Sequence, residues 1–220
     1  MAIASLAGVM IFAPAAPRGA LLQVFHLPQV FHLPQALAHW AAGHRGAPSS
    51  WKESVNRAAP GFTLTDQRGR PLSLSNLRGK AILLNFGFTS CTDLCPLQTA
   101  NMLEVLRRIG PGVPVHAIMI TTDPEVDRIK VLRAYGRRYG IDTRNWSFLT
   151  GPREALRKVW SAYGVSVAPL ARGLVDHNYV LALIDAGGNW RATYHGEAWD
   201  VKRVVEDFRK ILPRPFAMRR

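Results

Sequence analysis

Apolar and polar positions along the globular part of the chain follow two periodicities, one typical of strands and one typical of helices. The alternating stretches 62–65 and 72–74, separated by a turn at 66–69, predict a β-hairpin. A nearly continuous apolar run at 81–88 is typical of a buried strand. Apolar residues spaced along one helical face then predict a helix over 97–109.

The alternation of strands and helices continues toward the C-terminus. We expect further strands at 115–121, 146–149, 179–185 and 190–194. A helix is expected to begin with Asp123 as N-cap and Pro124 as its first residue, and two later helices have apolar faces within 156–163 and 201–208. Strands that alternate with helices favour parallel pairing with helices on both faces, and the last two strands add an antiparallel edge. The predicted fold class is α/β, a thioredoxin-like central mixed sheet flanked by helices, with an N-terminal β-hairpin.

Residues 1–50 have a different texture and predict a leader. The first residues form an apolar run, and the small residues at 13–15 and 36–38 resemble signal-peptide cleavage sites. A hexapeptide, Val-Phe-His-Leu-Pro-Gln, is repeated directly within 24–35, and its prolines argue against a membrane helix there. The four histidines of this region leave a metal-collecting tail as an alternative interpretation.

These changes of texture predict three parts. We expect a leader over 1–50, a signal peptide or weak anchor plus a low-complexity linker. A single thioredoxin-like domain is expected over 51–213, followed by a basic tail over 214–220.

Composition and charge narrow the class of protein. Of the 220 residues, 48% are hydrophobic and 20% charged, which excludes a chain disordered throughout, a coiled coil and a polytopic membrane protein. Lys and Arg total 28 and Asp and Glu 15, so the net charge is +13 and favours anionic partners: nucleic acid, acidic lipid or an acidic protein. Because the arginines are scattered and no nucleic-acid-reading motif accompanies them, nucleic-acid binding is the weakest of these.

The only two cysteines, Cys91 and Cys95, lie between a predicted strand and a predicted helix. One bridge over so short a segment cannot staple a domain, so the pair indicates a site. Residues at i and i+4 share a helical face with Cβ atoms roughly 6 Å apart, so the thiols can form a disulfide or hold one metal ion together. A helix N-terminus favours the thiolate, and two thiolates suit Cu(I) as well as zinc.

His177 is the best remote candidate for a third ligand. It precedes the strand predicted at 179–185, on a loop expected to lie beside the cysteine-bearing turn; a surface or core histidine is the plainer interpretation. Asp93 and Asp176 could orient the imidazole or adjust the charge at the site, or they are ordinary surface acids. The segment 165–175 is expected to be a mobile loop beside His177 or an ordinary surface connection.

With these residues in view, the chain resembles the SCO/SenC family. The stretch 86–96 (FGFTSCTDLCP) is similar to that family's Cys-x-x-x-Cys-Pro motif, 121–124 is similar to its Asp-Pro step, and the pair at 176–177 to its Asp-His pair. The resemblance covers roughly 59–212. Thr92 stands where the family commonly has proline. Asn178, the residue after His177, stands where the family commonly has serine.

The resemblance implies a copper metallochaperone, with Cys91, Cys95 and His177 as copper ligands and no catalytic residues. Reduced, the site holds copper as Cu(I), Cu(II) or both; oxidised, Cys91 and Cys95 form a disulfide. The implied function is assembly of the dinuclear copper centre of cytochrome c oxidase, by copper transfer, thiol reduction of the target, or both.

The implied partners are the copper-centre subunit of the oxidase, other copper chaperones and the membrane surface, without nucleic acid. The implied location is the periplasmic face of the inner membrane or the mitochondrial intermembrane space, with the protein anchored or secreted.

Two thiol enzymes are the alternatives to a chaperone. A thiol-disulfide oxidoreductase fits the fold, but its usual spacing is Cys-x-x-Cys, whereas this chain has three residues between the cysteines. A thiol peroxidase is suggested by the stretch 92–96 (TDLCP). The presence of Cys91 and the absence of a proline near Phe88 count against it.

Overall fold

The computed structural model describes residues 50–92, 94–170 and 175–213. The predicted leader, except Ser50, and the predicted basic tail lie outside the described residues. The described strands are β1 (Ser50–Ala58), β2 (Thr63–Asp66), β3 (Pro71–Ser73), β4 (Ala81–Gly87), β5 (Val115–Thr121), β6 (Trp146–Thr150), β7 (Val167–Pro169), β8 (Val175–His177), β9 (Val180–Ile184) and β10 (Asn189–Gly196). The described helices are the short 3₁₀ helix η1 (Leu74–Leu77), α2 (Leu94–Ile109), α3 (Ile129–Arg138), α4 (Arg153–Ala162) and α5 (Val201–Lys210).

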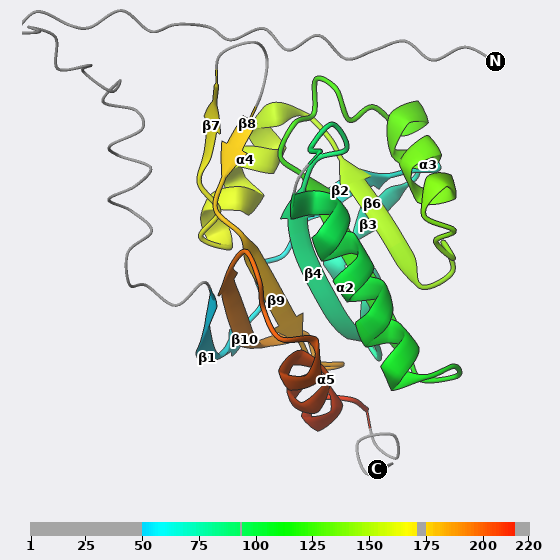
Figure 1. The fold of residues 1–220 in the computed structure, drawn as a ribbon, viewed down its shortest axis with the longest axis vertical. Coiled ribbons are helices and arrows are strands. Elements are labelled where there is room, and N and C mark those ends of the chain that lie inside the picture. The colour runs from blue at the N-terminus through cyan, green and yellow to red at the C-terminus, as the bar shows by residue number, and fades with distance from the viewer. Residues whose placement is uncertain (1–49, 93, 171–174, 214–220) are drawn as a thin grey trace, which may run out of the picture. The chain divides into compact units, whose positions relative to one another are not determined.

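A mixed sheet forms the centre of the fold, in the order β1-β10-β9-β4-β5-β6-β2-β3 (Figure 1). The central strands β4, β5 and β6 are parallel to one another. The other neighbours in the sheet pair antiparallel. The predicted α/β fold class and the N-terminal hairpin, β2–β3, are therefore confirmed.

The core divides between the two faces of this sheet. Successive residues of β4 alternate between the faces: Leu83 packs in the apolar cluster that includes residues of α2, α3 and α5, and Ile82 in the cluster that includes residues of α4 and η1. Figure 1 shows α2 lying along β4. Because β4 is buried along its whole length, the turn between it and α2 begins at a strand that is packed on both faces.

One edge strand was not predicted. β1 pairs antiparallel with β10, with Trp51 opposite His195. The late hairpin β9–β10 is therefore not the edge of the sheet, because β9 pairs with β4 and β1 covers β10. The sequence of β1 is mostly polar because the strand is largely exposed, so it lacks the apolar run by which buried strands are recognised.

The predicted helix start at Asp123 and Pro124 is wrong, since α3 begins only at Ile129. The intervening residues form a turn in which the backbone N–H of Asp127 donates to the carbonyl of Asp123 at 2.9 Å. This turn directs the Asp127 carboxylate to the hydroxyl of Thr121, at 2.7 Å. A contact with a neighbouring element thus overrides the local N-cap signal.

The segment 165–175, expected to be a mobile loop or an ordinary surface connection, is partly strand. It contains β7 and the first residue of β8, which pair antiparallel with Val167 opposite His177 and Pro169 opposite Val175; residues 171–174 lie outside the described part. His177 consequently ends a strand rather than lying on a loop.

Candidate metal centre

The two cysteines lie at the junction of β4 and α2, as predicted. Cys95 is in the first turn of α2 and only 4% exposed, whereas Cys91 is partly exposed on the preceding turn. The backbone N–H of Cys95 donates to the sulfur of Cys91 at 3.4 Å, and both residues are thiols. The helix start therefore presents an N–H to Cys91, the sulfur that a partner can reach.

The buried cysteine has a strongly perturbed acidity. A hydrogen bond with the Cys91 side chain and burial together raise the pKa of Cys95 far above its ordinary value. Cys95 therefore keeps its proton at neutral pH until a metal ion or a new sulfur bond replaces it. Of the two sulfurs, Cys91 is placed to meet a partner first and Cys95 to follow.

Gly87, at the end of β4, makes room for the buried sulfur. A Cβ at this position would lie 3.2 Å from the sulfur of Cys95 and 3.9 Å from that of Met119. Any side chain at this position would therefore crowd the Cys95 thiol. The apolar run that predicted the strand did not distinguish Gly87 from its neighbours.

A buried carboxylate anchors the loop that carries Cys91. Asp127 is fully buried and accepts from the backbone N–H of Thr89 at 3.1 Å, from the Thr89 hydroxyl, and from the Thr121 hydroxyl at 2.7 Å. Burial raises the pKa of Asp127 despite these donors. The loop two residues before Cys91 is thereby tied to the end of β5. No spacing rule in the sequence identified this role, because the partners are 38 positions apart.

His177 is 6% exposed and oriented by its own strand end. Its Nδ1 lies 3.0 Å from the carbonyl oxygen of Asn178, which can only accept, so Nδ1 carries the proton. Its Nε2 is buried and has no hydrogen-bond partner among the described residues. The ring packs against Phe88 and Tyr179, with centroids 5.8 and 5.0 Å away. Burial lowers the pKa of His177, which favours the neutral imidazole that binds metals.

The fold brings His177 toward the cysteine pair. Phe88, at the end of β4, contacts the imidazole, and Cys91 is close enough for its charge to act on the His177 pKa. Within the described ranges, however, no three His, Cys, Asp or Glu side chains stand close enough together to hold a metal ion.

The two acids named from the sequence and two further histidines have separate positions. Asp176 is exposed and acts on the His177 pKa through its charge, and Asp93 lies outside the described residues. His116 is buried on β5 with its Nε2 2.9 Å from the Ser147 hydroxyl. His195 stacks on Trp51 at the β1 edge.

Comparison with known proteins identifies the family. The sequence model of the SCO1/SenC family matches residues 52–213, nearly the whole described part. The chain belongs to the SCO1/SenC family. Among curated relatives, the mitochondrial SCO2 homolog of Bos taurus is 31% identical over 187 residues, which cover 80% of this chain and 69% of that protein.

Two solved Sco structures resemble this one. Arabidopsis thaliana ScoI, solved with copper bound, aligns with a TM-score of 0.61 and 28% identity, covering 68% of this chain and 94% of that one. BsSco, described with a disulfide switch and as a member of the Sco family of cytochrome c oxidase assembly proteins, aligns with a TM-score of 0.62 and 26% identity over 73% of this chain and 96% of that one. Copper is thus the metal of this family, and the fold is that of the thioredoxin-like Sco proteins.

The donor atoms of this Sco protein fit that metal. Two thiols and a neutral imidazole are soft to borderline ligands that suit copper, and the unpartnered Nε2 of His177 is the kind of buried atom that a metal would satisfy. Among the helices described, none is long and apolar enough to cross a bilayer.

Proposed function

We propose that this Sco protein is a copper metallochaperone whose cargo is held by Cys91, Cys95 and His177. The observation that carries the proposal is the buried Nε2 of His177, which lacks a hydrogen-bond partner in the described structure while Nδ1 is occupied by the Asn178 carbonyl. A bond from Nδ1 to a carbonyl fixes the tautomer that offers Nε2 to a metal. Asp176 and Asp93, the latter two positions after Cys91 in the sequence, are proposed to adjust the charge around the site.

The proposed site works only when reduced. Joining the sulfurs of Cys91 and Cys95 in a disulfide releases two electrons and two protons and removes two of the three copper ligands. A disulfide on a partner would accept those electrons and protons, so the same pair could instead reduce the partner, which leaves this chain oxidised and without two of its copper ligands. Partly exposed Cys91 would attack the partner disulfide, and buried Cys95 would then displace the partner thiol.

The proposed client is the subunit of cytochrome c oxidase that carries the dinuclear copper centre, with other copper chaperones as suppliers. The description of BsSco as an assembly protein of this oxidase supports it. The proposed location is outside the cytoplasm at a membrane surface, in the periplasm or the mitochondrial intermembrane space; the mitochondrial relative supports the latter. The proposed domain division is a leader over 1–50, the copper-binding domain over 51–213 and a basic tail over 214–220.

Anaerobic copper titration of the reduced full chain tests the site. We expect about one copper per chain, and Cys91→Ser, Cys95→Ser and His177→Ala should each abolish or weaken binding by at least about tenfold. His195→Ala is the matched control, because this histidine lies at the β1 edge. Undiminished copper binding in the cysteine variants would overturn the site. Adding the copper-free oxidase domain to the loaded chain then tests the client, since failure to transfer copper would contradict the assembly function alone.

A thiol-disulfide oxidoreductase is the second candidate function. It is favoured by the hydrogen bond between the buried thiol of Cys95 and the partly exposed thiol of Cys91. In such a pair the exposed thiol attacks the substrate disulfide and the buried thiol resolves the mixed disulfide. Rapid insulin reduction by a chain that binds no copper would favour this candidate over the chaperone.

A further inference from the structure

The exposed face of α3 carries an uncompensated positive charge. From position 128 to 138 the sequence reads RIKVLRAYGRR, which contains five basic residues and no acid. All five side chains are exposed, and among the described residues none of them forms an ion pair with a carboxylate. We call this surface the α3 basic face; it consists of Arg128, Lys130, Arg133, Arg137 and Arg138.

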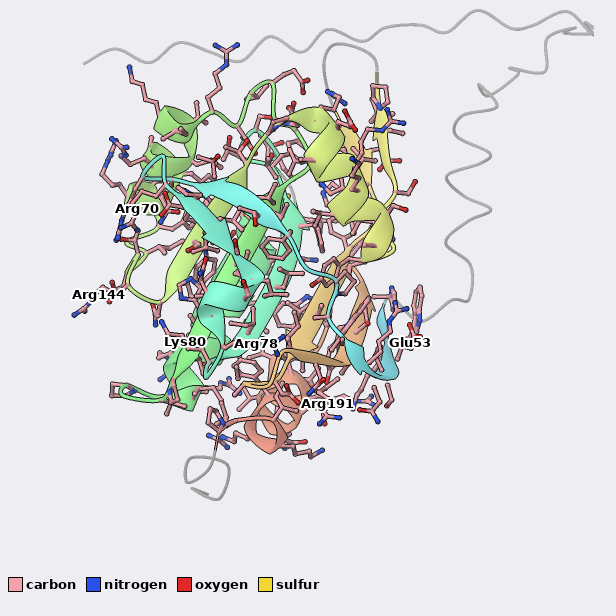
Figure 2. The ribbon with its side chains drawn as sticks, turned by 180° about the vertical axis from the view of Figure 1, so that it is seen from behind. Glu53, Arg70, Arg78, Lys80, Arg144 and Arg191 are labelled. Carbon is pink, nitrogen blue, oxygen red and sulfur yellow. The ribbon has the colours of Figure 1, made fainter. Side chains whose placement is uncertain are left out.

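Basic residues elsewhere on the domain are often neutralised or spread out. Arg70, Arg144 and Arg191 each form an ion pair with an aspartate at 3.0 Å or less. Figure 2 shows these three residues, with Arg78 and Lys80, distributed over different elements on the back of the molecule. The α3 basic face differs because its cations come from one helix and the residue just before it, and all of them are exposed to solvent.

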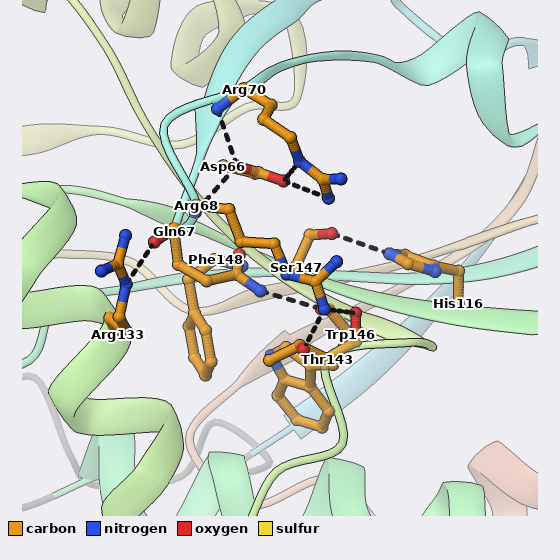
Figure 3. Close-up of polar contacts among 10 residues, drawn as sticks. All are labelled: Asp66, Gln67, Arg68, Arg70, His116, Arg133, Thr143, Trp146, Ser147 and Phe148. Atoms are coloured by element: carbon orange, nitrogen blue, oxygen red, sulfur yellow. Dashed lines mark hydrogen bonds and ion pairs between the residues drawn. The ribbon is translucent and has the colours of Figure 1, made fainter.

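The opposite side of α3 is fixed to the fold, so its charges are held in place. Leu132 and Tyr135 pack in the core, and the Tyr135 hydroxyl lies 3.0 Å from the hydroxyl of Thr99 on α2. On the exposed side, Arg133 donates to the carbonyl oxygen of Gln67 at 3.2 Å (Figure 3). Arg68, the residue after Gln67, therefore extends the positive surface beyond the helix.

The α3 basic face begins beside the candidate metal centre. Arg128 directly follows Asp127, whose carboxylate holds Thr89, two residues before Cys91. A ten-residue helix then carries the charges about 15 Å away from that point. Val126 and Val131, 40% and 36% exposed, provide apolar surface at the end nearest to the metal centre.

We propose that the α3 basic face docks the acidic surface of the protein that receives the copper; this rests on the proposed function. A recipient must bring its own ligands to Cys91, and a partner seated on the first turn of α3 is beside that residue. A protein partner is favoured over a lipid surface because exposed valines next to unpaired cations match a protein interface, and because lipid offers no acceptor for the metal. The face supplies the cations, so the recipient supplies the carboxylates.

A charge-reversal experiment tests the docking surface. The test variant combines Lys130→Glu, Arg137→Glu and Arg138→Glu, because none of these three side chains has a described hydrogen bond or ion pair to lose. The control combines Arg157→Glu, Lys202→Glu and Arg203→Glu on α4 and α5, which changes the net charge equally. The probe is the soluble, copper-free domain of the oxidase subunit with the dinuclear copper centre, and its Kd for the reduced, copper-free full chain is measured at low and physiological ionic strength.

We expect the test variant to weaken binding at least about tenfold at low salt and to lose most of the salt dependence, while the control stays within about threefold of the unmodified chain. The docking surface would be overturned if both variants weakened binding equally, or if the test variant did not weaken it. It would also be overturned if the oxidase domain did not bind the unmodified chain. Binding to phosphatidylglycerol-containing vesicles that depends on α3, with unchanged affinity for the domain, would instead assign the face to lipid.

Copper transfer to the same domain is followed separately with the loaded chain. Docking through α3 without transfer would contradict the chaperone function and leave the surface supported. Transfer that is insensitive to the test variant would support the function and overturn the surface.

Discussion

The Asp127 carboxylate holds Thr89 through both the backbone N–H and the hydroxyl of that residue. Two elements that are distant in sequence meet in this contact: the turn before α3 and the loop before Cys91. Because Asp127 is fully buried, removing one of its donors takes away part of what compensates the desolvation of the carboxylate. The contact therefore couples the stability of the domain to the position of the proposed copper ligand.

The anchor is tested by two substitutions at Thr89. Thr89→Val removes the hydroxyl with little change of shape, so we expect a loss of about 1–3 kcal/mol in the free energy of unfolding and several-fold weaker copper binding. Thr89→Ser keeps the hydroxyl and should remain close to the unmodified chain. Urea denaturation and competition with a copper chelator measure the two effects. Equal behaviour of the two variants would contradict the anchor.

Gly87 is predicted to control the position of the Cys95 sulfur. Gly87→Ala places a methyl group 3.2 Å from that sulfur, and we expect about threefold to tenfold weaker copper binding and a shifted disulfide reduction potential. Gly61→Ala is the matched control, since a Cβ there meets nothing within 4 Å. Copper titration and redox equilibration with glutathione measure the effects. A Gly87→Ala chain that matches the Gly61→Ala chain in both would refute this role.

His116 is predicted to make the stability depend on pH. Burial and, secondarily, the charge of Lys80 lower the pKa of His116 to about 4, below the ordinary value of 6.5. Between these values the unfolded chain binds more protons, so stability should fall as the pH drops from about 6.5 toward 4, by at most about 3 kcal/mol from this group. Figure 3 shows the contact of His116 with Ser147.

The contribution of His116 is isolated by comparison with His116→Asn, which removes the titrating group. Urea denaturation of both chains between pH 4.5 and pH 7.5 should give a weaker pH dependence for the variant. Parallel curves would show that other groups cause the acid sensitivity.

Asp207 is predicted to join the β1 edge to α5. Its carboxylate lies 2.6 Å from the Lys52 ammonium and 2.7 Å from that of Lys210, and it accepts from the Tyr194 hydroxyl at 2.5 Å. Burial opposes ionisation, yet these partners hold the pKa of Asp207 below its ordinary value. This stabilisation is present above the ordinary pKa of 3.8 and is lost as the pH falls below it.

We expect Asp207→Asn to lower the free energy of unfolding by about 2–4 kcal/mol, because Lys52 loses its carboxylate. Tyr194→Phe removes one donor only and should cost about 1 kcal/mol. Thermal and urea denaturation at pH 7 measure both. A loss no larger for Asp207→Asn than for Tyr194→Phe would contradict the central role of the carboxylate.

Local patterns were sufficient for the buried strands and for the position of the cysteine pair. The apolar run at 81–88 predicted β4, because a strand buried on both faces has apolar residues at nearly every position. The spacing of apolar residues after it predicted α2, because a helix buried on one side has them every three or four positions. The spacing of Cys91 and Cys95 placed both near a helix start for the same local reason. The position of His177 before a predicted strand made it the candidate third ligand, and the resemblance of three short motifs then supported it.

Tertiary packing determined three features that no local sequence pattern predicts: a turn, an edge strand and the tautomer of a histidine. Residues 123–128 form a turn where the sequence predicted a helix start, and in this turn Asp127 accepts a hydrogen bond from Thr89 on the loop before Cys91. The exposed strand β1 forms by pairing with β10. The tautomer of His177 depends on the carbonyl of Asn178 at the end of β8, where the sequence predicted a loop. Each of these features depends on the burial or hydrogen bonding of a polar group in the folded chain, and a residue's own neighbours in sequence do not determine such contacts.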